Sequence, residues 1–282
     1  MKKLQTHSAG IGAIAIVLVL VVIGVIGAVG YKVATNNNQS DKKDSGAQYA
    51  GISRDGQKSS QSSSADLSAQ PKLFNLGVEK LGPYDAASGT SGGFLVTKQA
   101  INVDTSRNFT FKGFYSFGEP LDEKRHNPNF EFAAVGKDTP IISAIDGVVV
   151  HIEEQAESKD YEVFLQTVEN SEWMIGYDHI TNLKVSQGQT IKVGDVIGTA
   201  AQQNNGFYRY EIQINREANG ETTFHCPTNL LDDSVAASIK KDITDLMTNW
   251  ESVAGLDLYD TTAMAAPGCK SLIMNVAEAE GR

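Results

Sequence analysis

Basic side chains are in the minority in this chain, and they form no long run. Its 282 residues include 24 Lys and Arg against 34 Asp and Glu, so the formal net charge is −10. The phosphates of nucleic acids would repel such a protein, which excludes a nucleic-acid-binding role. Cysteine is also scarce, with two residues and no Cys-x-x-Cys pair, so a zinc site built from cysteines is not expected.

Charge is absent from residues 10–31, an apolar stretch of Val, Ile, Leu, Ala and Gly that ends at Tyr31. A helix of this length, rising ~1.5 Å per residue, crosses the ~30 Å core of a bilayer. A cleaved signal peptide is the alternative, but its apolar region usually has about 7–15 residues. We therefore expect an uncleaved signal anchor in the plasma membrane. Residues 1–9 would be a cytoplasmic tail, and the rest of the chain an extracytoplasmic body.

Large apolar residues are nearly missing from residues 32–72, which are rich in Ser, Gln, Asn, Asp, Lys and Gly. Such a segment cannot bury enough surface to offset the entropy lost on ordering. It predicts a disordered linker, with the folded body beginning near Leu73.

Short alternating stretches separated by glycine-containing turns follow the linker. Residues 73–112 predict a lead-in segment packed against a core, and residues 113–231 predict a β-rich core. Many short strands with regular turns favour an antiparallel sandwich or barrel. Residues 232–282 predict a C-terminal helix and tail. Apolar residues recur there at three- and four-residue spacing over 233–254, after N-cap candidates that include Asp232.

Cys226 and Cys269 are the two cysteines, and they flank this predicted helix. Two thiols in one extracytoplasmic domain predict a disulfide. Two unpaired buried thiols are the alternative interpretation.

Several motifs occur in an order and spacing typical of one family. They are YSFG at 115–118, DGVVV at 146–150, GYDH at 176–179, VSQGQTIKVGDVIG at 185–198, NGFYRYEIQ at 205–213 and CPTNL at 226–230. Together they resemble the β-core of the lysostaphin-like (LytM) zinc metallopeptidases, which cut peptide cross-bridges in bacterial cell walls. The resemblance implies a duplicated hybrid fold. Biotinyl- and lipoyl-like hybrid folds share the strand and glycine pattern, so the motifs indicate fold more firmly than function.

The chain departs from that family at the metal site. The family's zinc ligands are the His and Asp of a His-x-x-x-Asp motif and the second His of a His-x-His pair. The Asp position falls on Glu131 and the first His position on Asn127, with His126 one residue early. The His-x-His pair falls on Tyr208 and Tyr210.

His179 alone matches a family histidine, which makes it and Tyr208 the candidate catalytic positions. With Asn127, Glu131 and Tyr210, they are expected to line the former cleft. Because two ligand positions and one catalytic position are altered together, no metal is expected, and Glu131 and His126 are the residual candidates.

Each candidate also has a simpler interpretation. His126 lies in a polar loop, where a histidine side chain is usually solvated. His179 could cap a loop by hydrogen bonding. Tyr208 and Tyr210 are expected to pack over the cleft and donate their hydroxyls to Glu131 or His179.

Three hypotheses for function follow. The first is a catalytically degenerate wall peptidase, a pseudoenzyme without cofactor, that binds peptidoglycan or regulates a wall hydrolase. The second is an active zinc metalloendopeptidase with a site built from His126, Glu131 and His179. The third is a structural or interaction domain of hybrid fold unrelated to the wall.

Overall fold

The computed structural model describes residues 65–79, 81–98, 102–104, 109–203 and 206–281. Residues 64–282 cluster as one compact unit, separate from residues 1–63. The predicted tail, the predicted membrane span at 10–31 and most of the predicted linker lie outside the described residues. Within the described ranges, no helix is both long and apolar enough to cross a membrane.

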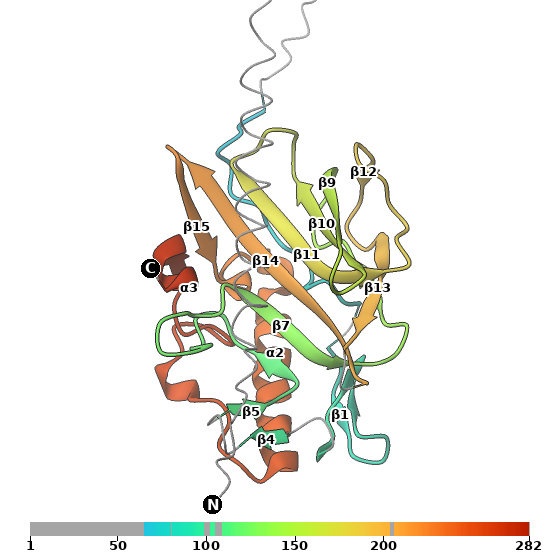
Figure 1. Cartoon of the computed structure of the whole chain (residues 1–282), viewed down its shortest axis with the longest axis vertical. Coiled ribbons are helices and arrows are strands. Elements are labelled where there is room, and N and C mark those ends of the chain that lie inside the picture. The colour runs from blue at the N-terminus through green and yellow to red at the C-terminus, as the bar shows by residue number, and fades with distance from the viewer. Residues whose placement is uncertain (1–64, 80, 99–101, 105–108, 204–205, 282) are drawn as a thin grey trace, which may run out of the picture. The chain divides into compact units, whose positions relative to one another are not determined.

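Antiparallel pairing dominates the fold, which confirms the predicted mainly β class (Figure 1). The main sheet has 14 strands. They are β1 (Tyr84–Asp85), β2 (Thr90–Ser91), β3 (Phe94–Leu95), β6 (Phe114–Tyr115), β7 (Asn129–Val135), β8 (Pro140–Ile142), β9 (Gly147–Gln155), β10 (Asp160–Gln166), β11 (Trp173–Thr181), β12 (Thr190–Ile191), β13 (Val196–Gln202), β14 (Tyr208–Ala218), β15 (Glu221–His225) and β16 (Ile273–Asn275). A separate pair joins β4 (Asn102–Asp104) to β5 (Phe109–Phe111).

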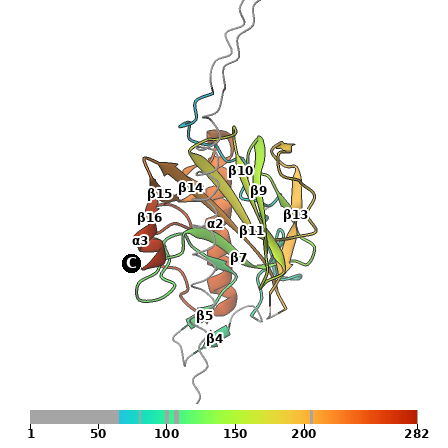
Figure 2. The same ribbon diagram turned by 45° about the horizontal axis from the view of Figure 1, so that its top comes forward.

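Strand β14 is the centre of the sheet, because it pairs with β7, β11, β13 and β15. Its register places Glu211 opposite Glu131 of β7 and opposite Asp178 of β11. At the far edge, β16 and the short helix α3 (Val276–Glu280) lie beside β15 (Figure 2). The order of the strands therefore brings segments from residue 129 to residue 218 into one continuous surface.

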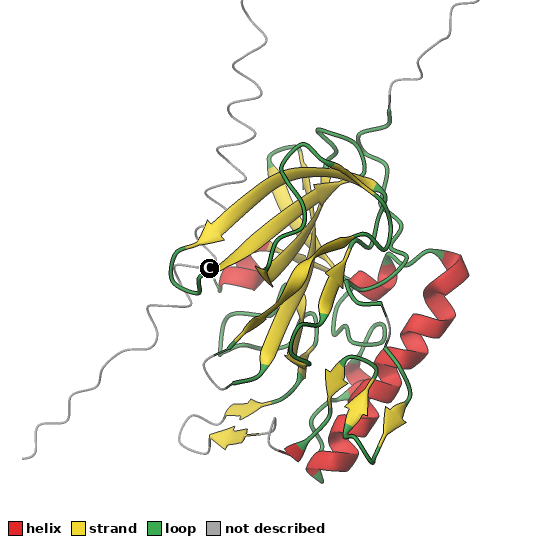
Figure 3. Ribbon diagram, turned by 90° about the vertical axis from the view of Figure 1, so that its right-hand side faces the viewer, coloured by secondary structure: helices red, strands yellow, loops and turns green. Residues whose placement is uncertain are grey.

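The predicted C-terminal helix is present as α2, Asp233–Ala254, and it lies along one side of the strands (Figure 3). Asp232 caps it by accepting a hydrogen bond from the Ser234 amide, and Gly255 ends it in the left-handed conformation. Its apolar face is buried in the core through Ile243, Leu246, Met247 and Trp250. Two short 3₁₀ segments, η2 (Pro227–Asn229) and η3 (Thr261–Ala263), flank the helix in the chain.

A disulfide joins Cys226 to Cys269, as predicted, and both residues are fully buried. The bond connects the entry to η2 with the tail beyond α2. It therefore encloses α2 in a covalent loop with a sequence separation of 43.

The ordered body begins before Leu73, which corrects the predicted end of the linker. The Leu67 carbonyl accepts a hydrogen bond from the Glu172 amide, and the Trp173 indole donates to the Ser68 carbonyl. Leu73 itself is fully buried, and its backbone forms a single β-bridge with Leu231, which lies just before α2. Backbone hydrogen bonds, which composition does not reveal, order this short polar stretch.

Candidate functional site

The two faces of β14 have opposite characters because side chains alternate along a strand. Tyr210, Ile212 and Ile214 are fully buried in the core. The intervening residues Arg209, Glu211 and Gln213 lie on the other face, which is polar. The candidate site lies on this polar face, where β7, β10, β11 and β14 run side by side.

Tyr210 is not on the polar face. Its ring stacks on Phe132 with the ring centroids 5.0 Å apart, and its hydroxyl donates to the Leu76 carbonyl at 2.7 Å. The expected hydrogen bond from Tyr210 to Glu131 or His179 is therefore not made. Tyr208 is half-buried and packs against the hydrophobic core.

Arg209 occupies the position that sequence comparison assigned to Tyr210. One guanidinium nitrogen lies 3.2 Å from Glu131 Oε1 and 3.7 Å from Glu211 Oε1. On β14, Arg209 and Glu211 lie on the face that meets Glu131, whereas Tyr210 lies on the opposite face. The register between β14 and β7 shifts between Tyr208 and Tyr210, which is where a one-residue displacement of the motif arises.

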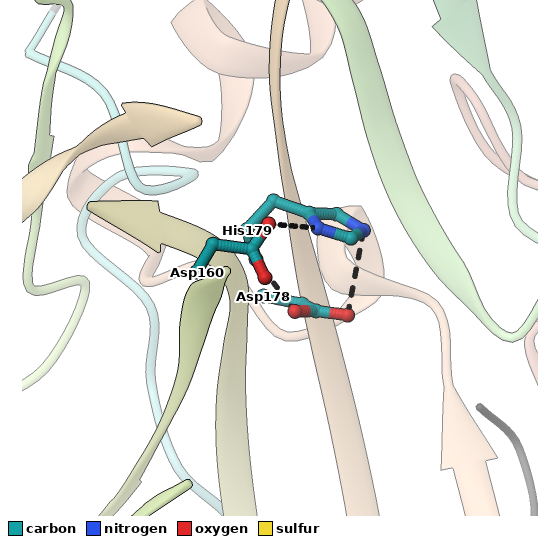
Figure 4. A group of neighbouring side chains, drawn as sticks. All are labelled: Asp160, Asp178 and His179. Atoms are coloured by element: carbon teal, nitrogen blue, oxygen red, sulfur yellow. Dashed lines mark hydrogen bonds and ion pairs between the residues drawn. The ribbon is translucent and has the colours of Figure 1, made fainter. Parts of the chain in front are cut away.

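His179 is buried and surrounded by carboxylates. Its Nδ1 lies 2.7 Å from Asp160 Oδ2, and its Nε2 lies 3.3 Å from Glu211 Oε1 and 3.6 Å from Asp178 Oδ2. Figure 4 shows Asp160 and Asp178 on two sides of the imidazole. The backbone of His179 has φ 59°, a strained value for a non-glycine residue. Its amide donates to Asp178 Oδ1 at 2.6 Å, which helps to hold this conformation.

Burial alone would lower the pKa of His179. The charge of Asp178 and the hydrogen bonds to Asp160 and Glu211 outweigh that effect and raise the pKa to about 10. At neutral pH the ring is therefore an imidazolium whose two nitrogens both carry protons. It is a cation surrounded by carboxylates, and it differs from the loop-capping histidine of the simpler interpretation.

The carboxyl groups of the site respond to burial in two ways. Burial and the neighbouring charge of Glu211 raise the pKa of Glu131 to about 7, and burial raises that of Asp178 to about 6. Burial and the charge of Asp178 raise the pKa of Glu162 well above its usual range. Burial would also raise the pKa of Glu211, but His179 and Arg209 hold it below the usual value.

The family's zinc ion does not fit these residues. The Asn127 side-chain amide donates to the Ser116 carbonyl at 3.2 Å, and its oxygen accepts from the Asn129 amide. The Arg209 cation lies against Glu131 in place of a neutral ligand. Fewer than three free ligands remain, whereas catalytic zinc requires three.

His126 does not join Glu131 and His179 either. It lines a separate open pocket of about 470 Å³ with Lys124, Asn275 and Glu278. Its Nδ1 lies 3.4 Å from the Glu278 carbonyl oxygen. The ligand set of the active-enzyme hypothesis is therefore not assembled.

Asp160, Asp178 and His179 form the one group of possible metal-binding residues among the described parts of the chain. In its protonated form His179 has no lone pair to offer a metal ion, because both ring nitrogens carry protons directed at carboxylates. Asp178 Oδ1 already accepts hydrogen bonds from the His179 amide and from Gln155 Nε2 at 2.8 Å. In this structure the group therefore holds a buried imidazolium between carboxylates.

Sequence reasoning missed Arg209, Glu211, Asp178, Asp160 and Glu162 as members of the site. For the first two, a usable signal was present, because Tyr208, Tyr210, Ile212 and Ile214 alternate as apolar residues. Residues 209 and 211 must then point to the opposite face. The remaining three become neighbours through strand pairing between β10 and β11, which no local motif marks.

Residues 130–221 match the sequence profile of Peptidase family M23, which confirms the family inferred from the motifs. The β-core is thus an M23 peptidase-family domain. No curated protein matches the chain in sequence.

Among solved structures, a solution structure of lysostaphin has 16% identity over 43% of this chain and 49% of its own, with a TM-score of 0.33. LytU has 24% identity over 40% and 79%, with a TM-score of 0.31. A chain of the SpoIIQ–SpoIIIAH pore-forming complex has 15% identity over 61% and 98%, with a TM-score of 0.35. This chain thus spans about half the length of that lysostaphin structure. These likenesses are low, and the family assignment rests on the profile and the motifs.

Proposed function

We propose that this chain is a membrane-anchored, extracytoplasmic M23 domain that binds cell-wall peptides without hydrolysing them. The contact between Arg209 and Glu131, 3.2 Å long, is the observation that carries the proposal. A fixed guanidinium supplies positive charge beside the carboxylate, but it cannot polarise and activate a water as an open-sided metal ion does. The domain keeps the surface of a wall peptidase and lacks the chemistry.

Two further observations support a binding role. The family profile covers the strands that form the polar face, which supports a role for this face in binding the same class of ligand. The alternative of an active zinc enzyme needs His126, Glu131 and His179 together, and His126 lies in a different pocket. The alternative of a hybrid-fold domain unrelated to the wall is less favoured because the profile match is to a peptidase family.

The test combines metal analysis, hydrolysis and binding with the full chain purified in detergent. We expect no stoichiometric zinc by mass spectrometry and no release of peptide ends from purified peptidoglycan, with or without added zinc. We expect the chain to co-sediment with the same peptidoglycan. Zinc-dependent hydrolysis that is lost in Glu131→Gln would overturn the proposal, and so would absence of co-sedimentation.

The membrane anchor and its orientation are part of the proposal and need a separate test. Protease added to spheroplasts should digest the body and leave a fragment that contains residues 10–31. The uncharged apolar stretch at these positions is the reason for this expectation. Full protection of the body in intact spheroplasts, with digestion after lysis, would contradict the orientation.

A further inference from the structure

Carboxylates outnumber cations on the polar face of the sheet. Glu131, Glu211 and Asp178 lie directly opposite one another across β7, β14 and β11. Neighbouring like charges at this spacing repel each other. The two cations that compensate this row are Arg209 and His179.

Two more carboxylates from β10 enlarge the excess. Asp160 is bonded to His179 Nδ1, and Glu162 lies two residues further along the same strand. Glu162 Oε1 lies 3.5 Å from the place that a Cβ on Gly176 would occupy, so it sits above β11 close to Asp178. Five carboxyl groups thus share two cations.

Glu162 is the carboxylate of this face that is both buried and without a hydrogen-bond donor. The residue is 4% exposed, and no described residue forms a hydrogen bond or ion pair with its carboxylate. Its charged neighbours are mainly further acids, Asp178, Glu211 and Glu153, together with His179. A buried carboxylate without a donor is costly, so this group is poised for a donor from outside the chain.

Other unpaired atoms on the same face need a donor too. Glu153, opposite Glu162 on β9, has a buried Oε2 without a hydrogen bond, although His151 Nε2 lies 3.9 Å from it, and Asn129 has a buried Oδ1 without a hydrogen bond. Gln213 Nε2, an unpaired donor, lies on β14 opposite Asn129 and not beside Glu153 or Glu162. The deficit around Glu162 is therefore one of hydrogen-bond donors and of positive charge.

We propose that the acid cluster of Glu162, Asp178 and Glu211, with Glu131 and Glu153 at its two ends, binds a primary ammonium group carried by a peptide. An alkylammonium is a compact charge with three donors and no acceptor, which matches the three neighbouring carboxylates on the adjacent strands β10, β11 and β14. A divalent metal ion is disfavoured because Arg209 and the His179 imidazolium already lie against the carboxylates. This inference rests on the proposed function, since a peptide that is bound and not cleaved is its ligand.

A ligand can reach the cluster. The side chains of Arg209, Asp178 and Glu131 keep 27%, 18% and 17% of their surfaces exposed, while Asp160 and His179 form the buried floor. An ammonium at the end of a flexible side chain would enter past Glu131 and Asp178 and reach Glu162. Lysine-like side chains have this shape, because a thin apolar stem carries the charge at its end.

The test uses N-acetyl-lysine methylamide and its Nε-acetyl derivative as probes. They share length and stem and differ in the ammonium alone. In calorimetric or NMR titrations with the full chain at pH 7 and low salt, the charged probe should bind saturably. The acetylated probe should not bind, and added salt should weaken the charged probe.

Two variants locate the site. Glu162→Gln should weaken the charged probe by about tenfold or more, because it removes a charge-assisted contact. Glu154→Gln is the matched control, because it removes the same formal charge from an exposed position on β9 beside Glu153. It should change the affinity by less than about twofold. Thermal unfolding of both variants checks that each is folded.

Equal effects of the two variants would indicate general electrostatic attraction and overturn the inference. No saturation by the charged probe at roughly 10 mM, or equal binding of both probes by the wild-type chain, would also overturn it, even if Glu162→Gln fails to fold. The proposed function is judged separately by peptidoglycan hydrolysis and sedimentation. Intact sedimentation with no probe binding would remove this inference alone.

Discussion

Arg209 and Glu131 face each other across β14 and β7, with guanidinium nitrogen and carboxylate oxygen 3.2 Å apart. Both side chains are mainly buried, and Glu211 lies next to both. The guanidinium supplies positive charge to two carboxylates of the polar face. On the proposed function, this one cation both occupies the place beside Glu131 and balances part of the acidic cluster.

Removing the Arg209 cation should destabilise the fold. Arg209→Met leaves Glu131 and Glu211 without their shared partner, and we expect a loss of about 1–3 kcal/mol, reduced from a fully buried pair because the site is partly exposed. Urea unfolding at pH 7 measures this loss in the free energy of unfolding. Lys192→Met is the control, since its ion pair with Asp146 is exposed and should matter little. Equal stability of the two variants would show that the guanidinium is not needed.

Zinc affinity should be recoverable by substitution at positions 127 and 209. Asn127→His with Arg209→His would place two imidazoles near Glu131 and complete a three-ligand set. We expect the double variant to bind zinc in calorimetric titrations, and the wild-type chain to bind none.

The comparison variant is Asn127→His with Tyr210→His. It should bind no zinc and lose about 2–4 kcal/mol of stability, because Tyr210 fills the core and donates to Leu76. Zinc binding by this variant in preference to the first would restore the motif-based assignment of Tyr210.

His225 should make the fold sensitive to mild acid. Burial, with a smaller contribution from Arg216, lowers the pKa of His225 to about 4, and its ring packs 4.6 Å from that of Trp173. The unfolded chain then binds more protons between about pH 6.5 and 4, so the free energy of unfolding falls as the pH decreases through that window. The loss should reach roughly 2–3 kcal/mol.

Chemical denaturation between pH 4 and 7 tests this effect, with His225→Gln as the comparison. The variant should show a flatter profile between pH 6.5 and 4, because its side chain does not titrate. Identical slopes for the two proteins would show that other groups dominate the acid sensitivity.

Breaking the disulfide should lower stability without abolishing the β-fold. The Cys226–Cys269 bond closes a loop with a separation of 43, which the chain-entropy model values at about 3–4 kcal/mol. Dithiothreitol should therefore lower the unfolding midpoint of the wild-type chain. The double variant Cys226→Ser with Cys269→Ser should start from that lower midpoint and should not respond to reductant.

Gly113 should be intolerant of a side chain. A Cβ there would lie 1.9 Å from the Trp250 ring, so α2 could not keep its place against the sheet. Gly113→Ala should cost about 1–3 kcal/mol by overpacking. Gly93→Ala, whose Cβ would meet Thr139 at 3.6 Å, should change stability little. Similar unfolding midpoints for the two variants would contradict the packing of Trp250 over Gly113.

Local physics made part of this protein predictable from its sequence. The spacing of apolar residues and the cap at Asp232 define α2 within one stretch of chain, and the structure has it over Asp233–Ala254. The glycine and strand motifs indicated the family that the sequence profile identifies. Two cysteines permit a single intramolecular pair, so the choice lay between that bond and free thiols.

The candidate site was decided by tertiary structure. The motifs place one of the family's ligand positions on Tyr210, but a strand turns successive side chains to opposite faces, and only residues on the polar face can meet Glu131. Arg209 does so, while Tyr210 enters the core. Glu162 comes near Asp178 only through the pairing of β10 with β11. The sequence by itself determined the elements and the family, because these depend on neighbours along the chain. The charge balance of the site depends on long-range strand pairing and burial, which only the folded structure sets.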